Sequence, residues 1–335
     1  EVVITGIVTK RKESFTGSAA TYNQKELREV GGTNILQSLK SLDPAFAMRE
    51  NVQFGSDPNR LPNLEIRGKT SLLGVRTELG VDPNQPLFIL DGFESSLQAI
   101  NDLDINLVAS ITILKDAAST AIYGSKAANG VVVVETIKPQ PGKMRVTYNG
   151  NYNIQAPDLS SYNMMNASEK LEFEHLAGVF DRVDNTTVPP TEADMIMAEL
   201  YNSRVRLIAQ GVNTNWMSEP LRVGTNMKHS ITVGGGQEKF QFSVGGGYNG
   251  MSGVMKGSKR TIINGNINLN YRVSKIQFTN LFSVSNAQSQ NPMVNYSEFS
   301  RTNPFYKKTN NGVVEPYLEN TTTTQIFNPI WNASR

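Results

Sequence analysis

The chain has no cysteine, and only two of its 335 residues are histidine. The missing cysteine excludes a disulfide framework and a thiolate metal site, and it fits an oxidising compartment. His175 stands close to Glu172 and Glu174, but no second histidine lies at metal-ligand spacing. We therefore expect no metal site and no cofactor.

The chain also lacks an excess of charge of either sign. Its 32 Lys and Arg residues nearly balance its 30 Asp and Glu residues, and they form no dense basic patch. This balance argues against a nucleic-acid partner. No apolar run reaches the roughly 18 residues that a membrane-spanning helix needs. Because 39% of the residues are apolar and 19% are charged, the composition is that of a folded chain.

The first 139 residues mix short β-branched runs with helical spacing. "NQKELREVGGTNILQSLKSL" (23–42) has helical apolar spacing, whereas "LFILDGF" (87–93) and "VVVVETI" (131–137) resemble strands. These patterns predict a compact α+β domain. Pro139 and Pro141 end it, because proline cannot donate to a sheet ladder. We place a boundary near residue 140.

Small residues crowd the stretch from Ile113 to Ile137. Asp116 is positioned to cap a short helix, and Gly124 suits the position after that helix. Asn129 and Gly130 suit a turn with positive φ. The following valines are apolar enough for burial on both faces of a sheet. The stretch therefore predicts tight packing and no catalysis.

Beyond residue 140 the pattern changes to strict alternation. It occurs in "MRVTYNGNYNI", "FQFSVGGGY", "IINGNINLNYRV" and "KIQFTNLFSV", each with one apolar and one strongly polar face. Alternation over about ten residues is typical of an outer-membrane barrel strand. A soluble sandwich strand also alternates. The links favour the barrel over the sandwich, because the tight turns "GGGQEKF" and "RVSKI" alternate with long polar segments.

One of these long links, at about residues 155–226, is predicted to contain two helices. The first begins after Asn166, and the second begins after Thr191 with Asp194 completing a capping box. We expect their apolar stripes to pack against the barrel rim. The stripes consist of Phe173, Leu176, Ala177 and Phe180, and of Met197, Leu200, Tyr201, Val205 and Ile208.

Five amphipathic strands cannot close a barrel, and an open edge in lipid leaves costly unpaired backbone groups. Large plugged transporters have about 22 strands. We therefore expect the chain to be an N-terminal fragment of a longer protein.

Several motifs give the chain a specific resemblance. "LEIRG" (64–68), "LKDAASTAIYGSKAANG" (114–130) and "GKMRVTYNG" (142–150) occur in order, followed by "NTNWMSEPLR" (213–222) and "GVMKGSKR" (253–260). In these motifs the chain resembles SusC/RagA-type TonB-dependent outer-membrane transporters. The resemblance implies an α+β plug domain followed by the first antiparallel strands of a large transmembrane β-barrel of about 22 strands.

On this resemblance we expect three segments. Residues 1–12 would be a TonB-box-like segment, 13–140 the plug domain, and 141–335 the start of the barrel with its long helix-containing loop at about 155–226. The protein would lie in the outer membrane of a Gram-negative bacterium, in contact with outer-membrane lipid.

The resemblance also implies a function and its partners. The function is active import of a nutrient, either an oligosaccharide or an oligopeptide. TonB, with its inner-membrane motor proteins, would supply energy, and a SusD-like surface lipoprotein would capture the glycan or peptide substrate. The alternative is a plug-barrel protein that serves as a structural partner in another outer-membrane complex and needs no working TonB box.

Two groups of residues are candidates for these contacts. The TonB-box-like segment is Glu1, Val2, Val3, Ile4, Thr5 and Gly6. A β-branched segment can add as a strand to a partner sheet, although it could also be an ordinary first strand of the plug. Two long polar connections in the plug, at 50–60 and 74–85, are expected to touch substrate. Their candidate residues are Asn51, Gln53, Asp57, Arg60, Arg76, Asp82 and Asn84.

Catalytic patterns are weak. "GGGYNG" (245–250) matches the dinucleotide motif G-x-G-x-x-G but lies inside an alternating strand. The aspartates Asp91, Asp102, Asp104 and Asp116 could in principle supply a carboxylate pair for glycoside hydrolysis. Capping and turns explain Asp91 and Asp116 better. We expect that the protein is not an enzyme.

Overall fold

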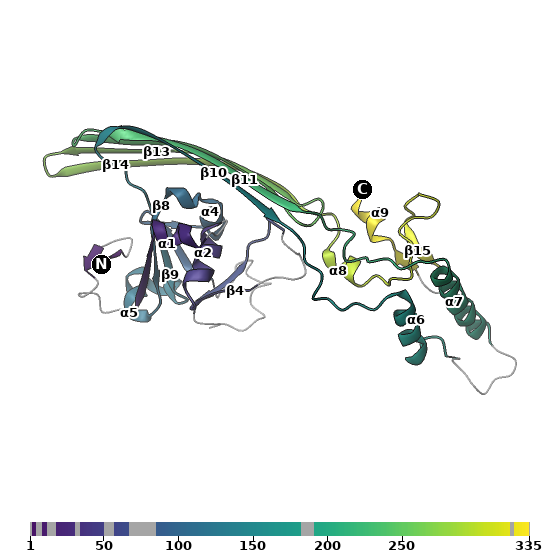
Figure 1. Ribbon diagram of the computed structural model, residues 1–335. Helices are drawn as coiled ribbons and strands as arrows, with labels where there is room; N and C mark the ends of the chain where they lie inside the picture. Colours follow the sequence, from purple (N-terminus) through teal and green to yellow (C-terminus); the bar gives the residue numbers. More distant parts are fainter. Residues whose placement is uncertain are drawn as a thin grey trace.

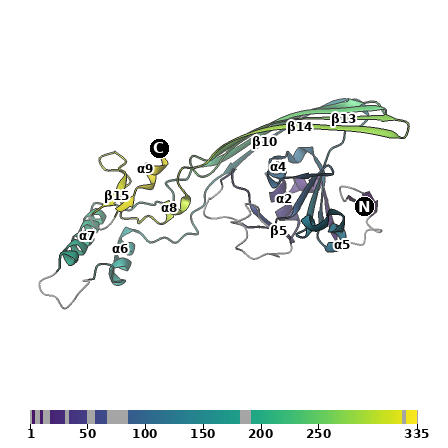
Figure 2. The same cartoon turned by 180° about the vertical axis from the view of Figure 1, so that it is seen from behind.

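The computed structural model describes residues 2–4, 9–11, 18–30, 34–49, 57–66, 85–181, 191–321 and 325–334. In this part of the chain three bodies follow one another. A small α/β unit lies under a long curved sheet, and a helical cluster extends from one end of that sheet (Figures 1 and 2).

The α/β unit is built on a five-stranded sheet with the order β3-β8-β9-β6-β7. Its strands are β3 (Ala19–Asn23), β6 (Leu87–Leu90), β7 (Phe93–Ser95), β8 (Val108–Leu114) and β9 (Val131–Thr136). Pairing is antiparallel except between β6 and β9, which are parallel.

The predicted burial of the β9 valines on both faces is confirmed. Val132 and Val134 pack in one apolar cluster, whereas Val131 and Val133 pack in another. The first cluster also contains side chains of the helices α1 (Gln24–Glu29), α2 (Ile35–Leu42) and α4 (Leu97–Asp102). The second includes Ala127 of the 3₁₀ segment η4 (Ala121–Ala127), which follows α5 (Ala117–Thr120). The small residues before β9 therefore allow close packing on its second face.

The turn into β9 requires glycine at residue 130. Gly130 has φ of 93°, and an added Cβ would lie 3.1 Å from both the Leu114 carbonyl oxygen and Cδ1 of Ile66. Gly124 also has positive φ, at 67°, but it lies inside η4 and does not follow a finished helix. The predicted cap at Asp116 is confirmed, because its Oδ1 accepts from the Ser119 N–H at 2.7 Å.

Two short hairpins lie outside this sheet. β1 (Val2–Ile4) pairs with β2 (Thr9–Arg11), and β4 (Phe46–Arg49) pairs with β5 (Asn63–Ile66). Phe46, Leu64 and Ile66 belong to the main apolar cluster of the α/β unit. The second hairpin is therefore part of that core.

The long sheet is antiparallel, with its strands in sequence order. They are β10 (Gly142–Gln155), β11 (Gly224–Gly236), β12 (Phe240–Ser252), β13 (Lys259–Val273) and β14 (Ile276–Gln290). The two predicted tight turns are confirmed between β11 and β12 and between β13 and β14. Large apolar side chains such as Tyr148, Ile263 and Phe278 are about 60% exposed, so the apolar face of this sheet points outward.

The predicted helices of the long link are present. They are α6 (Ala167–Leu176), capped by Asn166, and α7 (Glu192–Ala209), capped by Thr191. They join a cluster with α8 (Tyr296–Ser300), β15 (Tyr317–Asn320), β16 (Gln325–Phe327) and α9 (Pro329–Ala333).

The expected apolar stripe of α6 is wrong for two of its residues, although Phe180 packs against this cluster as expected of an apolar stripe. Phe173 and Leu176 are 51% and 80% exposed, whereas Leu171 is buried against residues that include Trp216 and Phe305. A charge sets the orientation of the helix, because Glu174 binds the buried Arg204 of α7 at 2.9 Å. Arg204 also contacts Glu319 and lies over the ring of Phe305. A buried guanidinium without carboxylate partners would be costly. The ion pair with Arg204 therefore determines which face of α6 is buried, and the apolar stripe does not.

Within the described residues, no helix is both long and apolar enough to cross a membrane.

Candidate functional site

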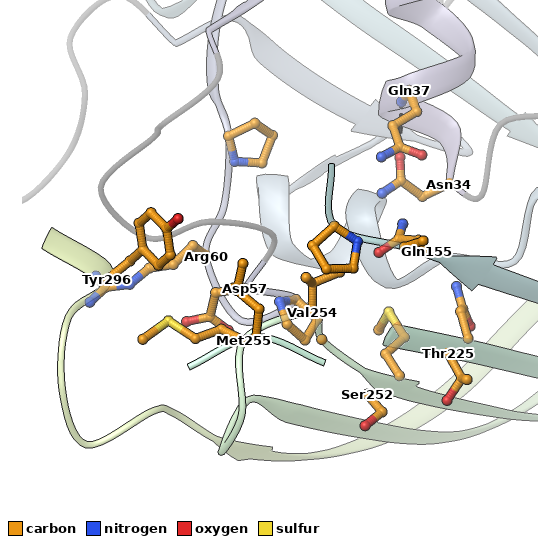
Figure 3. A pocket seen from close by; sticks show the side chains of 18 of the residues that line it. Asn34, Gln37, Asp57, Arg60, Gln155, Thr225, Ser252, Val254, Met255 and Tyr296 are labelled. Atoms are coloured by element: carbon orange, nitrogen blue, oxygen red, sulfur yellow. Dashed lines mark hydrogen bonds between the residues drawn. The ribbon is translucent and has the colours of Figure 1, made fainter. Parts of the chain in front are cut away.

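A cavity of about 640 Å³ lies where the α/β unit meets the loop end of β11 and β12 (Figure 3). The α/β unit supplies Asn34 and Gln37 from the start of α2 and Asp57 and Arg60 from the connection before β5. The long sheet and its loops supply residues that include Gln155, Thr225, Ser252, Met255 and Tyr296. A cavity of this size with convergent polar groups is typical of a small-molecule site.

Two of the seven predicted substrate residues are found at this cavity. Asp57 is buried, and its Oδ1 accepts from the Asn59 N–H at 3.0 Å, which fixes the loop that also presents Arg60. The other five lie outside the described residues, namely Asn51, Gln53, Arg76, Asp82 and Asn84.

Two ion pairs join the α/β unit to the long sheet beside this cavity. Asp102 ends α4 and Asp104 precedes the 3₁₀ turn η3 (Ile105–Leu107). Nη2 of Arg260 in β13 lies 2.6 Å from Oδ2 of Asp102, and Nζ of Lys228 in β11 lies 3.0 Å from Oδ1 of Asp104. The four side chains are at most 12% exposed. Removing one member of such a pair leaves a buried charge, at a cost of about 3–5 kcal/mol.

The charge on Asp104 is stabilised by its surroundings. Burial alone would raise its pKa, but the Lys228 ammonium and the Asn106 backbone N–H oppose burial, and the pKa falls below its ordinary value. Asp104 Oδ1 also accepts from the Asn106 N–H at 3.0 Å. The carboxylate is therefore held ionised in contact with Lys228.

A third contact fastens the loop of Asp57 to the same wall. Asn59 Nδ2 donates to the carbonyl oxygen of Gln290 at 2.7 Å and to that of Lys259 at 3.3 Å. These two residues pair across β14 and β13. The cavity is thus bounded by a loop that hydrogen-bonds the barrel backbone directly.

The sequence interpretation missed this junction. From the sequence, Asp102 and Asp104 are candidates only for a catalytic carboxylate pair, and the pattern does not pair them with Arg260 and Lys228. A signal exists, because Lys228 is the single cation on its face of β11, and Arg260 shares its face of β13 only with Arg272 at the opposite end of the strand. A lone cation on an inward face requires a buried anion, and that anion must come from another part of the chain.

The N-terminal segment forms a short hairpin. Val2, Val3 and Ile4 form β1 and, in the part of the chain that the structure describes, β1 pairs only with β2. Glu1, Thr5 and Gly6 lie outside the described residues.

The remaining candidates for catalysis or metal binding have structural roles. Asp91 accepts from the Thr136 N–H and hydroxyl at 2.8 and 2.7 Å, so it ties β6 to β9. The motif at 245–250 lies within β12. The ring of His175 lies tilted beside that of Tyr201, with 5.2 Å between the ring centres, and the described residues contain no group of three His, Asp or Glu side chains that could hold a metal ion. The junction can bind a ligand and hold charges, but it presents no activated nucleophile.

Comparison with known proteins shows what the chain is similar to. Residues 11–131 match the TonB-dependent Receptor Plug Domain family. The TonB-dependent receptor SusC of Bacteroides thetaiotaomicron is 25% identical over 280 residues, covering 80% of this chain and 24% of that protein. TonB-dependent receptor P26 of Formosa agariphila is 28% identical over 231 residues, covering 64% of this chain and 22% of that protein. The chain therefore spans about a quarter of the length of its curated relatives.

Solved structures agree on the fold. The RagAB peptide importer in its open-open state superposes with a TM-score of 0.73 at 24% identity, over 100% of this chain and 38% of that one. The relatives are receptors and importers, in agreement with the expectation that the chain is not an enzyme.

Residues 11–131 thus match the plug domain of TonB-dependent receptors, and the chain is SusC/RagA-like in sequence and fold, with a plug followed by the first strands of an outer-membrane barrel.

Proposed function

We propose that the whole protein imports a nutrient across the outer membrane with energy from TonB and its inner-membrane motor proteins. A SusD-like lipoprotein captures the substrate, an oligosaccharide or an oligopeptide, and delivers it to the plug. The observation that supports this most is the cavity shared by plug and barrel wall, which the predicted residues Asp57 and Arg60 help to line (Figure 3). RagAB, which superposes on the chain, is itself described as a peptide importer.

We propose the following division of the chain. Residues 1–12 are the TonB-binding segment, 13–140 the plug domain, and 141–335 the start of the barrel. The segment Glu1–Gly6 binds TonB by strand addition, which is favoured by the β-branched residues of β1. A strand in a two-stranded sheet has a second edge at which a partner strand can add.

We propose that the substrate contacts the plug through both polar connections. Asp57 and Arg60 supply charge at the cavity, and Asn51, Gln53, Arg76, Asp82 and Asn84 extend the contact surface. Charged and amide side chains suit both hydroxyl-rich glycans and peptide backbones.

The test uses the full-length protein purified from outer membranes in mild detergent. Mass spectrometry identifies the proteins and small molecules that co-purify. A SusD-type lipoprotein together with a bound glycan or peptide supports import. In parallel, deletion of residues 1–7 should abolish growth on that substrate without lowering the amount of protein in the membrane. Growth that is unaffected by the deletion would instead favour a structural role in another complex.

A further inference from the structure

Between the ion pairs and Arg272 near the far end of β13, the inner face of β11, β12 and β13 carries no charge. Side chains two apart in a strand share a face, so the face of Lys228 and Arg260 continues toward the tight turns. Apart from the buried Ile262, it presents hydroxyl, amide and glycine positions, which we call the polar lane. The lane consists of Ser230, Thr232, Gly234, Ser243, Gly245, Gly247, Asn264, Asn266 and Asn268.

Asparagine side chains lie across the glycines of this lane. A Cβ placed on Gly247 would meet Oδ1 of Asn264, and one placed on Gly245 would meet Oδ1 of Asn266. The neighbouring Gly246 points to the opposite face, where an added Cβ has no atom nearer than 3.8 Å. The side chains of Asn264 and Asn266 therefore occupy the space that a larger residue at either glycine would need.

One asparagine of the lane has an unmet hydrogen-bonding requirement. Asn268 is 7% exposed, and its Oδ1 accepts no hydrogen bond from the residues that the structure describes. A buried amide oxygen is costly unless a donor reaches it. This atom is suited to hydrogen-bond a transient donor, such as water or the hydroxyl or amide group of a cargo molecule.

The ion pairs stand at the boundary between the cavity and the lane. Lys228 lines the cavity while it binds Asp104, and the next residue on its face, Ser230, already belongs to the lane. Across β12, Met251 of the cavity pairs with Arg260, which binds Asp102. A molecule passing from the cavity along this wall must separate the carboxylates from their cations.

We propose that the polar lane is the route along which cargo passes between plug and barrel wall, and that the pairs Asp102–Arg260 and Asp104–Lys228 close its entrance. This proposal rests on the proposed import function. When the plug loop moves away, Lys228 and Arg260 face the lane entrance, where hydroxyl or carbonyl oxygens of the cargo replace the carboxylates. The lane then offers neutral donors and acceptors, which suits uncharged hydrogen-bonding cargo.

The experiment uses the absence of cysteine in the chain and applies to the full-length protein, with any cysteine elsewhere replaced. Gly247→Cys places a thiol in the lane, and Gly246→Cys places one on the outer face as the matched control. A sulfonated dye maleimide is added to intact cells. Each thiol is tested with the ion pairs intact and in the double variant Asp102→Asn, Asp104→Asn.

We expect labelling of Gly247→Cys to be slow with the pairs intact and at least ten times faster without them. Labelling of Gly246→Cys should not change between the two backgrounds. A rate at residue 247 that is the same in both backgrounds would overturn the proposal. So would an equal acceleration at residue 246.

A further variant separates the opening of the entrance from general unfolding of the plug. The charge exchange Asp104→Lys with Lys228→Asp restores one pair in reverse and should slow labelling again when Asp102 is intact. Fast labelling in this variant would contradict the assigned entrance. Labelling measures access to the lane and does not measure uptake. If the labelling pattern is as expected but the protein imports no nutrient, the proposed function is refuted and the accessible lane is still supported.

Discussion

The plug sheet and the barrel sheet are built in opposite ways. β9 of the plug is a short strand whose valines are buried on both faces. The barrel strands have 13 to 15 residues, and they expose their apolar face while a polar face turns toward the plug. Figures 1 and 2 show the plug under the long sheet, with α4 on the side of the plug that faces it. The plug must therefore meet the barrel through polar groups, because the apolar side of the barrel faces away.

This difference indicates how the plug can be stable and yet removable. Its own core is apolar and does not depend on the barrel. Its attachment consists of ion pairs and hydrogen bonds, which water or cargo can replace. The following predictions test this separation, beginning with the largest effect.

A charge in the plug core should be the most damaging change. Val133→Asp places a carboxylate at a residue that is 1% exposed, so we expect a loss of about 4 kcal/mol or more in the free energy of unfolding. Ser243→Asp, on the polar face of the barrel sheet, serves as the control and should cost far less. Limited proteolysis and thermal unfolding of both variants make the measurement. If both variants resist proteolysis and heat equally well, the two sheets do not differ in the way described.

Breaking one ion pair should rank next. Asp104→Asn leaves Lys228 buried and unpaired, at an expected cost of about 3–5 kcal/mol in attachment of the plug. The double variant with Lys228→Gln should cost less than the sum of the single changes. Hydrogen exchange of residues 97–114 measures the effect. Additive costs would mean that the pair is not coupled.

A charge on the outer face of the barrel should cost somewhat less. Phe282 is 57% exposed near the middle of β14, so Phe282→Arg should destabilise the protein in lipid vesicles by about 2–4 kcal/mol. The neighbouring Ser283 faces inward, and Ser283→Arg is the matched control with a small expected cost. Denaturant unfolding in vesicles compares the two. The assignment of the faces fails if the control is the more damaging.

Acid should weaken the attachment without melting the plug core. The folded pKa of Asp104 lies below its ordinary value of 3.8, so its contribution is complete above that value and is lost as the pH falls through the folded pKa. Exchange of residues 97–114 should therefore be constant near neutral pH and rise only below about pH 4. In Asp104→Asn this rise should be smaller. A rise that begins near pH 6 would point to a different group.

The smallest effect is expected at Asn59. Asn59→Ala removes two hydrogen bonds to barrel carbonyl oxygens and should cost about 1 kcal/mol in attachment. The exposed Asn151 of β10 provides the control, and Asn151→Ala should have no measurable effect. Exchange of the loop at residues 57–62 makes the comparison. If the two variants exchange at the same rate, Asn59 does not contribute to the attachment of the plug.

Much of the fold could be predicted because it depends on local pattern. Alternation gave the barrel strands, and the capping boxes at Asn166 and Thr191 gave α6 and α7. The junction could not be predicted in the same way. Asp102 lies 158 positions from Arg260, and nothing local to either residue identifies its partner. The prediction for the orientation of α6 is wrong for the same reason, because this orientation depends on an arginine that is far away in the sequence.

The most direct test of the polar attachment is a charge exchange at Asp102 and Arg260, measured by hydrogen exchange of residues 97–114 in the full-length protein in membranes. Asp102→Arg alone places two cations together and should accelerate exchange about a hundredfold, which corresponds to about 3 kcal/mol. The exchanged pair Asp102→Arg with Arg260→Asp should restore most of the protection. If the single and the exchanged variants protect this segment as the native protein does, the ion pairs do not hold the plug to the barrel wall.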